Sequence, residues 1–551
     1  MKKFIIGFLA LVILAVGVGG FYLFKHRGSS ETSTKYNEFS FISEDKDIDK
    51  DDFDRIDGQY YLSLDFIKEH IDDTVAYDKA EKTVIFTNDK GTRRAKVGET
   101  EGVINTKKFG IRDPIVEKNG KILIPSEIFI YDYPVELTYI QDKKLLLMDY
   151  TDVDYAVGVS TGDGLNMRET ASLNSPIVSI LNKDSKVYVY GEKGDFYKVR
   201  EIEGYAGYIK KDLLDVEFPQ ERLKVKNESE KREAKKPLNL TWDYTYGPQS
   251  EESIEAIGNV KGLDVICPTW FSIKDTDLNI IDRGNQEYVN RYNSLGIDVW
   301  AYLDNSFDPE LTQKVLSKSS SRDIIIKKTL ELTKKYGLKG INIDFENTTV
   351  DDRDNITQFV RELSGVFKQE NLLVSVDVTP QISSNVKNEL YDRKALADVC
   401  DYVMLMAYDQ HWSSSDKAGS VAQYKWVEGN LNVLFKQIPH EKMILGVPLY
   451  TRLWSESSGE VKSSVLSMYQ TENLLATKSL NPKWDEESKQ NYAEYSENNK
   501  KYKIWIEDSD SIEWKTSLVN KYNLAGVASW RKGFETDDIW STLDNTISAY
   551  N

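Results

Sequence analysis

The chain has 551 residues, of which 40% are hydrophobic and 11% aromatic, and its formal net charge is −18 at pH 7. This length predicts several domains, and the hydrophobic content excludes an intrinsically disordered protein. The acidic balance argues against a nucleic-acid partner, because nucleic-acid binding requires a basic patch.

The first predicted element is an apolar segment at the N-terminus. After Lys2 and Lys3, the residues from Phe4 to Phe24 carry no charge, and this run is long enough to span a bilayer as a helix. It ends in FYLFKHR and lacks the small-residue cleavage site of a secretory signal. We therefore expect residues 1–27 to be an uncleaved signal-anchor rather than a cleaved signal, with all later domains on the extracellular, cell-wall side of the membrane.

A weak internal repeat follows a polar and acidic linker at residues 28–54. Within residues 55–151, YDKAEKTVIF from Tyr77 is matched by YIQDKKLLLM from Tyr139, and LSLDFI and IPSEIF precede these runs at the same offset. Each half predicts a short helix, a strand, a charged turn and a second strand. The repeat resembles the copper amine oxidase N-terminal-like domain, a wall-associated module. Because His70 is its only histidine, we infer no copper site.

Residues 155–215 predict a small β-barrel, with short strands separated by glycine and Asn-Ser turns. The run LNMRETASLNSPIVSIL, followed by GDFYKVR and GYAGYI, resembles the bacterial SH3 domain. In that family such modules commonly hold peptide or glycan parts of the cell wall. A spacer barrel without a ligand is the alternative.

A charge-dense linker at residues 216–236 precedes a domain over residues 237–551, in which apolar strand-like runs alternate with helical stretches. Amphipathic segments such as RDIIIKKTLELTKKYG, from Arg322, follow several of the runs. Eight β-then-α units predict a (β/α)₈ TIM barrel. The eight runs are LNLTW, LDVICP, IDVWAYL, GINIDFE, LLVSVDVTP, DYVMLMAY, KMILGVPLY and AGVASW.

The stretch between the seventh and eighth predicted strands, residues 451–524, is too long for one helix. We expect a small inserted subdomain there, together with the seventh helix. The predicted fold class is thus multidomain: a single transmembrane helix, an α+β repeat domain, an SH3 barrel and a C-terminal TIM barrel.

Two acids share one face of the fourth predicted strand. In GLKGINIDFEN the polar residues Asn342, Asp344 and Glu346 alternate with apolar ones, so in a strand they point the same way. Active groups of TIM barrels lie at the carboxyl ends of the strands. Two adjacent carboxyl groups cannot both ionise cheaply, so one keeps a proton near neutral pH and can act as a general acid. This pattern indicates glycosidase chemistry.

Few side chains suit metal or redox chemistry. The two cysteines, Cys267 and Cys400, lie in apolar strand-like runs, so we interpret them as buried reduced thiols. The four histidines show no metal-ligand spacing, and there is no glycine-rich phosphate loop. We expect neither a metal nor another cofactor.

Four motifs carry a family resemblance. GINIDFE resembles the core of the D-G-x-D-x-D-x-E signature of glycoside hydrolase family 18, the chitinase-like family. MAYD, GVPLYTRLW and GVASW resemble the sixth-, seventh- and eighth-strand motifs of that family and occur in the same order. The details PTWF, KWDEE and IWIEDSDSIEWK resemble the spore-coat and cortex glycosylase branch, whose members act on peptidoglycan during germination.

The resemblance implies catalytic roles for three residues. Family members use no enzyme nucleophile, because the substrate's own 2-acetamido oxygen attacks the anomeric carbon. Glu346 would protonate the glycosidic oxygen and then activate water. Asp344 would accept a hydrogen bond from the acetamido N–H, and Tyr408 would hydrogen-bond the acetamido carbonyl.

The resemblance also implies a set of substrate-binding residues. Asp409, Tyr450 and Arg452 would contact the sugar near the cleavage point, and Trp530 would form an apolar floor beneath the distorted ring. The alternatives are that Trp530 and Tyr408 belong to the barrel core and that Arg452 pairs with a surface acid. The full set is Asn342, Met406, Asp409, Tyr450, Arg452 and Trp530.

The chain departs from the family signature at three positions. Lys339 and Asn342 replace its first and second Asp, and Phe345 replaces the usual Trp or Tyr. Because an amide cannot take up or release a proton, we expect Asp344 to titrate more simply. Asn342 can still hydrogen-bond Asp344 and hold its rotamer. Glu346 and Asp344 are retained, so we expect activity.

The sequence therefore predicts a cell-surface glycosidase that hydrolyses β-1,4 bonds next to N-acetylglucosamine in peptidoglycan, with retention of configuration. A chitinase acting on another N-acetylated polymer is the alternative within this class. A non-catalytic glycan-binding wall protein is the alternative from another class, and the presence of Glu346 disfavours it. The expected partners are an N-acetylglucosamine-containing glycan and the membrane.

Overall fold

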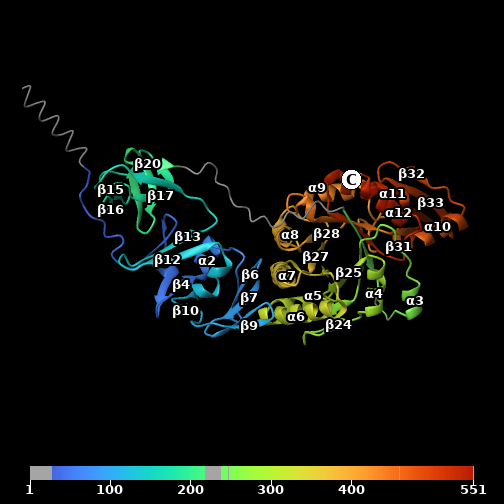
Figure 1. Ribbon diagram of the computed structural model, residues 1–551. Helices are drawn as coiled ribbons and strands as arrows, with labels where there is room; N and C mark the ends of the chain where they lie inside the picture. The colour runs from blue at the N-terminus through green and yellow to red at the C-terminus, as the bar shows by residue number, and fades with distance from the viewer. Residues whose placement is uncertain (1–27, 218–236, 246, 248, 458, 550–551) are drawn as a thin grey trace, which may run out of the picture. The chain divides into compact units, whose positions relative to one another are not determined.

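The computed structural model describes residues 28–217, 237–245, 247, 249–457 and 459–549 (Figure 1). The predicted signal-anchor lies outside the described residues, as does nearly all of the predicted linker at 216–236. Within the described ranges, no helix is long and apolar enough to cross a membrane. The contacts divide the chain into two compact units.

The first unit contains two four-stranded sheets built from the repeat region. Their strand orders are β12-β13-β1-β2 and β10-β11-β4-β3. LSLDFI starts helix α2 (Leu64–His70), where the Ser63 side chain caps the helix by accepting from the Phe66 N–H. Its counterpart IPSEIF forms only a 3₁₀ turn, Ser126–Ile128. The strands are β1 (Ser40–Ser43), β2 (Lys46–Asp47), β3 (Phe53–Ile56), β4 (Gln59–Ser63), β10 (Val116–Lys118), β11 (Lys121–Pro125), β12 (Val135–Ile140) and β13 (Leu145–Tyr150).

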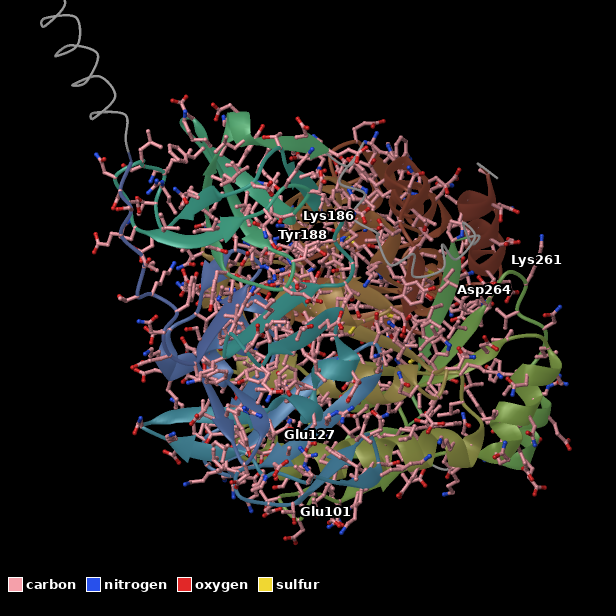
Figure 2. The ribbon with its side chains drawn as sticks, turned by 60° about the vertical axis from the view of Figure 1, so that its left-hand side comes forward. Glu101, Glu127, Lys186, Tyr188, Lys261 and Asp264 are labelled. Carbon is pink, nitrogen blue, oxygen red and sulfur yellow. The ribbon has the colours of Figure 1, made fainter. Side chains whose placement is uncertain are left out.

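The SH3 module in the same unit is a seven-stranded sheet of order β16-β15-β19-β18-β17-β14-β20. Met167, Val187, Val199 and Ile209 form the fully buried part of its core. Tyr188 of β17, labelled in Figure 2, packs on the Tyr155 ring, with the ring centroids 4.8 Å apart. The strands are β14 (Ala156–Ser160), β15 (Leu165–Arg168), β16 (Ile177–Leu181), β17 (Lys186–Lys193), β18 (Phe196–Glu201), β19 (Ala206–Lys210) and β20 (Leu214–Glu217).

The second unit contains the predicted barrel, and all eight predicted strand runs form its strands. Seven neighbouring pairs of these strands are parallel, and the eighth parallel pair, β22 with β25, closes the ring. The backbone N–H of Asn239 donates to the Asp264 carboxylate at 2.8 Å, which links the first two strands at their amino ends. Asp264 is labelled in Figure 2. The strands are β21 (Leu238–Asp243), β22 (Val265–Pro268), β25 (Asp298–Asp304), β26 (Gly340–Asp344), β27 (Leu373–Val378), β28 (Tyr402–Met406), β29 (Met443–Pro448) and β35 (Gly526–Trp530).

Helices cover the outer face of the barrel. Alternation along each strand sends apolar side chains outward, so that Ile341, Ile343 and Val376 pack in the layer between strands and helices. Helix α6 ends where Gly337 adopts a left-handed φ of 64°, a conformation that glycine enters without a Cβ clash. The main helices are α4 (Gln286–Ser294), α5 (Pro309–Leu316), α6 (Ser319–Tyr336), α7 (Arg353–Lys368), α8 (Arg393–Val399), α9 (Tyr424–Leu434), α11 (Ser509–Tyr522) and α12 (Ile539–Ser548).

A five-stranded antiparallel sheet forms the expected insertion between β29 and β35. Its order is β31-β30-β34-β33-β32, and helix α10 (Met468–Thr477) accompanies it. Glu507, which follows the sheet, is buried and pairs with buried Lys515 of α11 at 2.8 Å. The strands are β30 (Tyr450–Ser457), β31 (Glu460–Ser467), β32 (Lys483–Asp485), β33 (Gln490–Glu497) and β34 (Lys500–Ile506).

A second five-stranded sheet, made from the first repeat, belongs to the barrel unit. The contacts group residues 76–96 and 101–109 with residues 232–551. A guanidinium N–H of Arg94 donates to the buried Glu362 carboxylate of α7 at 2.7 Å, and Arg322 of α6 pairs with the same carboxylate at 2.9 Å. The strands are β5 (Ala76–Asp78), β6 (Thr83–Asn88), β7 (Gly91–Lys96), β8 (Glu101–Ile104) and β9 (Lys107–Gly110).

Candidate active site

Strand β26 places the two acids at the carboxyl end of the barrel, as the alternation predicted. All five of its residues are buried, and Asn342 and Asp344 point inward while Ile341 and Ile343 pack outward. Glu346 follows two residues after the strand and is half-buried. Its backbone is hydrogen-bonded to the loop after the neighbouring strand β25: its N–H donates to Asn305 Oδ1 at 3.2 Å, and its carbonyl accepts from Asn305 Nδ2 at 2.8 Å.

The two acids are in hydrogen-bond contact. Glu346 shares a hydrogen bond with Asp344, which requires a proton on one carboxyl group. Burial, followed by the charges of Glu346 and Asp377, raises the pKa of Asp344 well above its ordinary value. Burial and the Asp409 charge raise the pKa of Glu346. The Tyr302 hydroxyl also donates to Asp344, so this pair can present a carboxylate and a carboxylic acid at the same pH.

Asn342 lies beneath the acids with both ends of its amide occupied. Its Oδ1 accepts from the Trp242 indole at 2.9 Å. Its Nδ2 donates to Ser375 Oγ at 3.1 Å and to Asp377 Oδ1 at 2.9 Å. The sequence allows Asn342 to hydrogen-bond Asp344, but the amide NH₂ is directed to β27 instead. Because Asn342 is fully buried, its side chain influences the site through the residues that it hydrogen-bonds.

Strand β28 positions the MAYD motif beside the acids. Met406 ends the strand and is buried, and Tyr408 follows it, half-buried. Burial and the neighbouring charges of Asp377 and Glu346 raise the pKa of the Tyr408 hydroxyl well above its ordinary value. A tyrosine that keeps its proton is a hydrogen-bond donor, which is what a carbonyl oxygen of a ligand requires.

Asp409, Tyr450 and Arg452 form one cluster next to Tyr408. Asp409 has a left-handed φ of 57°, and its Oδ1 accepts from the Tyr450 hydroxyl at 2.6 Å and from Arg452 Nη2 at 3.3 Å. The Tyr450 ring meets the Tyr408 ring edge-on, with centroids 6.4 Å apart. The insertion strand β30 therefore supplies polar groups to the same end of the barrel as β28.

Trp530 ends β35 and is linked to the acid-bearing strand through Trp242. Its ring meets the Trp242 ring edge-on at 6.1 Å, and the Trp242 indole in turn donates to Asn342. Trp530 is partly exposed, so one part of the indole is available to a ligand. The predicted residues from β26, β28, β30 and β35 thus come together at one end of the barrel.

Several residues of the site were not predicted. Tyr302 and Asp304 of β25 and Asp377 of β27 point into the barrel beside β26, and the Tyr391 hydroxyl donates to the Phe345 carbonyl at 2.8 Å. The signal for Asp377 was present, because VSVDV alternates apolar and polar residues as INID does.

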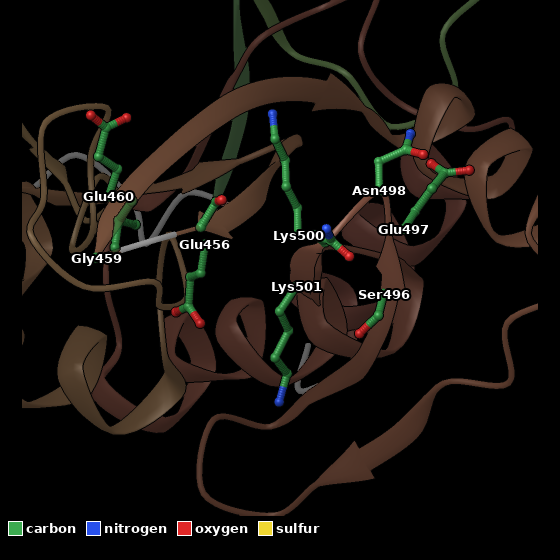
Figure 3. Close-up of a pocket in the computed structure, with 11 residues that line it drawn as sticks. Glu456, Gly459, Glu460, Ser496, Glu497, Asn498, Lys500 and Lys501 are labelled. Carbon is green, nitrogen blue, oxygen red and sulfur yellow. The ribbon is translucent and has the colours of Figure 1, made fainter.

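A cavity in the inserted sheet is not lined by Asp344 or Glu346. It has a volume of about 740 Å³ and lies at the tips of two hairpins of the insertion, between Glu456 and Glu460 on one side and Glu497, Lys500 and Lys501 on the other (Figure 3). Among the described residues, no group of three or more histidine, cysteine, aspartate or glutamate side chains is arranged to hold a metal ion.

A closed (β/α)₈ barrel with paired acids at the carboxyl ends of its strands defines a class, the TIM-barrel glycosidases. Residues 292–535 match the model of glycosyl hydrolases family 18, residues 163–215 the bacterial SH3 domain, and residues 52–146 the copper amine oxidase N-terminal domain. The chain therefore carries a family 18 glycoside hydrolase domain, preceded by these two modules.

Several known glycosylases are similar to a little under half of this chain. The uncharacterized glycosylase YvbX of Bacillus subtilis is 27% identical over 260 residues, which are 45% of this chain and 74% of that protein. The cortical fragment-lytic enzyme of B. subtilis is 24% identical over 254 residues, 45% of this chain and 59% of that protein. The putative sporulation-specific glycosylase YdhD of B. subtilis is 27% identical over 229 residues, and 54% of its length is covered.

Solved structures share the fold. A chitinase from Chromobacterium violaceum has a TM-score of 0.51 at 21% identity and covers 57% of this chain and all of its own length. The spore cortex-lytic enzyme SleL of Bacillus cereus has a TM-score of 0.51 at 21% identity, covering 56% of this chain and 74% of its own. At this identity the likeness concerns the fold of the barrel domain.

Proposed function

We propose that the C-terminal domain hydrolyses β-1,4 bonds next to N-acetylglucosamine in peptidoglycan by substrate-assisted, retaining catalysis. The observation that carries this proposal is the hydrogen-bonded pair Glu346 and Asp344 with Tyr408 beside it. Such a pair holds a proton ready for a leaving oxygen and a negative charge ready for a developing cation.

The first step breaks the glycosidic bond. Glu346 gives its proton to the leaving oxygen while the acetamido carbonyl oxygen attacks the anomeric carbon, forming an oxazolinium ion. Asp344 accepts a hydrogen bond from the acetamido N–H and stabilises the positive charge. The Tyr408 hydroxyl donates to the acetamido carbonyl and holds it for attack.

The second step restores the enzyme. Glu346, now a carboxylate, takes a proton from water, and the water oxygen attacks the anomeric carbon from the face that the leaving group left. The oxazolinium ring opens, so the product keeps its configuration. Asp409, Tyr450 and Arg452 would bind polar groups of the sugar, and Trp530 would pack under its C–H face.

Two kinds of observation support peptidoglycan as the substrate. The chain carries a bacterial SH3 module and a copper amine oxidase N-terminal domain. The resemblance to these two families is what suggests attachment to the cell wall. Relatives of the barrel domain include a cortical fragment-lytic enzyme and a sporulation-specific glycosylase by name. Solved structures with the same fold include a chitinase, so chitin belongs in the test as the alternative substrate.

The test is digestion of purified vegetative and cortex peptidoglycan by the full chain, with mass spectrometry of the released muropeptides. Reducing-end N-acetylglucosamine would identify a glucosaminidase, and reducing-end N-acetylmuramic acid a muramidase. Glu346→Gln should lower release by about 10²–10⁴-fold, the usual share of a general acid, while glycan binding persists. If the wild type binds peptidoglycan and colloidal chitin but releases nothing from either, the protein is a glycan-binding wall protein instead.

We also propose that residues 4–24 anchor the protein in the cell membrane, with residues 28–551 on the cell-wall side. The uncharged apolar length of that segment supports the proposal. Protease treatment of intact protoplasts should degrade the chain, and the protein should fractionate with membranes until detergent is added. A chain that resists protease until lysis would contradict the orientation.

A further inference from the structure

Asp377 is a buried carboxyl group beside the paired acids, and the mechanism above gives it no role. It lies on β27, two residues after Ser375, which is in register with Asn342 of β26. Because side chains alternate along a strand, Val376 packs outward and Asp377 faces the barrel interior, level with Asp344. Only 1% of Asp377 is exposed.

The hydrogen bonds of Asn342 determine which end of its amide faces Asp377. An indole N–H is a donor only, so the Trp242 contact identifies the oxygen of the Asn342 amide. The amide NH₂ therefore faces β27 and donates to Asp377 Oδ1 at 2.9 Å. Burial raises the pKa of Asp377 well above its ordinary value, the Asn342 donor opposes that rise, and the Glu346 charge adds to it.

The charge of Asp377 is set among groups that carry no positive charge. The side chains that face it from the packed elements are Cys267, Asn342, Asp344, Glu346, Tyr391 and Tyr408. Among the ion pairs of the described residues, none involves Asp377, Asp344 or Glu346. Three carboxyl groups in one buried site cannot all ionise, so the position of the protons depends on their hydrogen-bond donors.

We propose that Asp377 is a positioning residue for the reaction proposed above: held by Asn342 level with Asp344, this third carboxyl group sets the pH up to which the Asp344–Glu346 pair keeps its transferable proton. This inference rests on the proposed function. A carboxylate next to the pair makes further ionisation unfavourable, so Glu346 stays protonated to a higher pH and remains a competent acid. The Asn342 amide on β26 and the Asp377 carboxyl group on β27 therefore act together as a hydrogen-bonded pair.

Exchanging the amide and the carboxyl group between positions 342 and 377 tests this pair. Asp377→Asn, Asn342→Asp and the double variant are prepared in the full chain, and kcat/KM is measured against pH on a soluble N-acetylglucosamine oligomer. We expect Asp377→Asn to lower kcat/KM at least about tenfold and to move the alkaline limb down by about one pH unit. Asn342→Asp should move that limb up. The double variant, which restores one amide and one carboxylate, should return it toward the wild-type position.

The matched control is Asp243→Asn. Asp243 ends β21, is buried, and accepts from the Tyr288 hydroxyl at 2.6 Å, but it makes no contact with the paired acids. Its loss should lower the melting temperature without moving the alkaline limb. The inference is overturned if the alkaline limb of kcat/KM in Asp377→Asn lies at the wild-type pH. It is also overturned if the limb of the double variant lies no closer to the wild-type pH than that of Asp377→Asn. If Asp377→Asn does not fold, the Asn342→Asp and double variants decide it.

A second readout separates this inference from the proposed function. The infrared C=O band of the protonated carboxyl group, assigned by its loss in Glu346→Gln, can be titrated without turnover. It should disappear at lower pH in Asp377→Asn than in the wild type, and an unchanged midpoint overturns the inference. An inactive wild type would overturn the proposed function and leave this titration to decide the role of Asp377.

Discussion

At the scale of single residues, the site depends on where one proton lies. The hydrogen bond between Glu346 and Asp344 needs a proton, and the Tyr302 hydroxyl donates to Asp344. The Tyr302 donor favours the ionised form of Asp344, while burial and the charges of Glu346 and Asp377 raise its pKa, so the pair as a whole holds one proton. The arrangement supplies the acid and the charged partner that glycoside cleavage needs.

The Tyr408 hydroxyl gives the first prediction. Tyr408→Phe should lower kcat by about 10²-fold with a smaller change in KM, because the lost hydrogen bond strengthens as the acetamido oxygen attacks. The phenyl ring keeps the packing, so the melting temperature should hold. Steady-state kinetics on a soluble oligomer measures both constants. Tyr495→Phe, in the inserted sheet, is the matched control, and a Tyr408→Phe enzyme with wild-type kcat would contradict the assigned role.

The second prediction concerns pH. The Asp409 charge contributes to the raised pKa of Glu346, and an asparagine can still accept from Tyr450. Asp409→Asn should therefore lower the pKa of Glu346 and move the alkaline limb of kcat/KM to lower pH. Because Asp409 is 45% exposed, solvent screening should keep the shift below about one unit. A limb that moved to higher pH would show that Asp409 does not act on Glu346 through charge.

Alternation within single strands made much of the site predictable. The pattern Asn-x-Asp-x-Glu indicated an inward polar face on β26, and the structure has that face. The partners of Asn342 were not predictable, because Trp242 and Asp377 reach it from strands far away in the sequence. The same alternation in β27 predicts that Asp377 faces inward. Only the neighbouring acids, which come from another strand, show that it belongs to the site.

At the scale of elements, a small sheet covers part of the barrel's helical layer. In the barrel unit, Thr92 of β7 donates through its hydroxyl to the Glu362 carbonyl of α7 at 3.0 Å. A Cβ at Gly365 of α7 would come within 2.7 Å of Thr87, so the glycine permits this close packing. Burial would raise the pKa of Glu362, but Arg94 and Arg322 outweigh it and hold that pKa below its ordinary value.

The third prediction is the effect of Arg94→Ala on stability. The variant leaves fully buried Glu362 with one cationic partner instead of two, and should lower the free energy of unfolding at pH 7 by about 3 kcal/mol. Denaturant titration followed by fluorescence measures it. Lys368→Ala is the control, because its ion pair with Asp89 is exposed and contributes little.

The same contact predicts a pH dependence. Glu362 has a lower pKa in the folded chain than in the unfolded one, so its contribution to stability is present above the unfolded pKa and is lost as pH falls through the folded value. The deficit of Arg94→Ala should therefore be largest near neutral pH and shrink in acid. A deficit that is equal at pH 7 and pH 4 would mean that the arginine acts by packing alone.

The strands were more predictable from the sequence than the contacts between segments that lie far apart in it. Eight apolar runs gave all eight barrel strands, since each combines strand propensity with a helix that follows it. The hairpins around Tyr77 were also predicted within a module spanning residues 55–151. Their grouping with the barrel was not, because it depends on contacts such as Arg94 with Glu362, which are 268 positions apart.

At the scale of the whole molecule, the compact unit that contains the active site is discontinuous in the sequence. It combines residues 76–96 and 101–109 with the family 18 domain, while the SH3 module belongs to the other unit. A fragment that begins at Pro237 keeps every proposed catalytic residue but lacks the sheet that packs on α7.

The fourth prediction follows from this composition. A 237–551 fragment should melt several degrees below a 28–551 chain, because it exposes the Gly365 surface and leaves Glu362 short of Arg94. Differential scanning calorimetry of both proteins, at equal concentration, measures the difference. Identical melting temperatures would show that the sheet does not stabilise the barrel.

In the proposed mechanism, the substrate's acetamido group, helped by Asp344 and Tyr408, displaces the leaving sugar to which Glu346 gives its proton. The most direct measurement is the anomeric configuration of the first product, followed by proton NMR within minutes of adding the full chain to an N-acetylglucosamine oligomer. We expect the β-anomer to appear first and Glu346→Gln to yield no product on this time scale. An initial α-anomer, or a Glu346→Gln enzyme that turns over like the wild type, would contradict it.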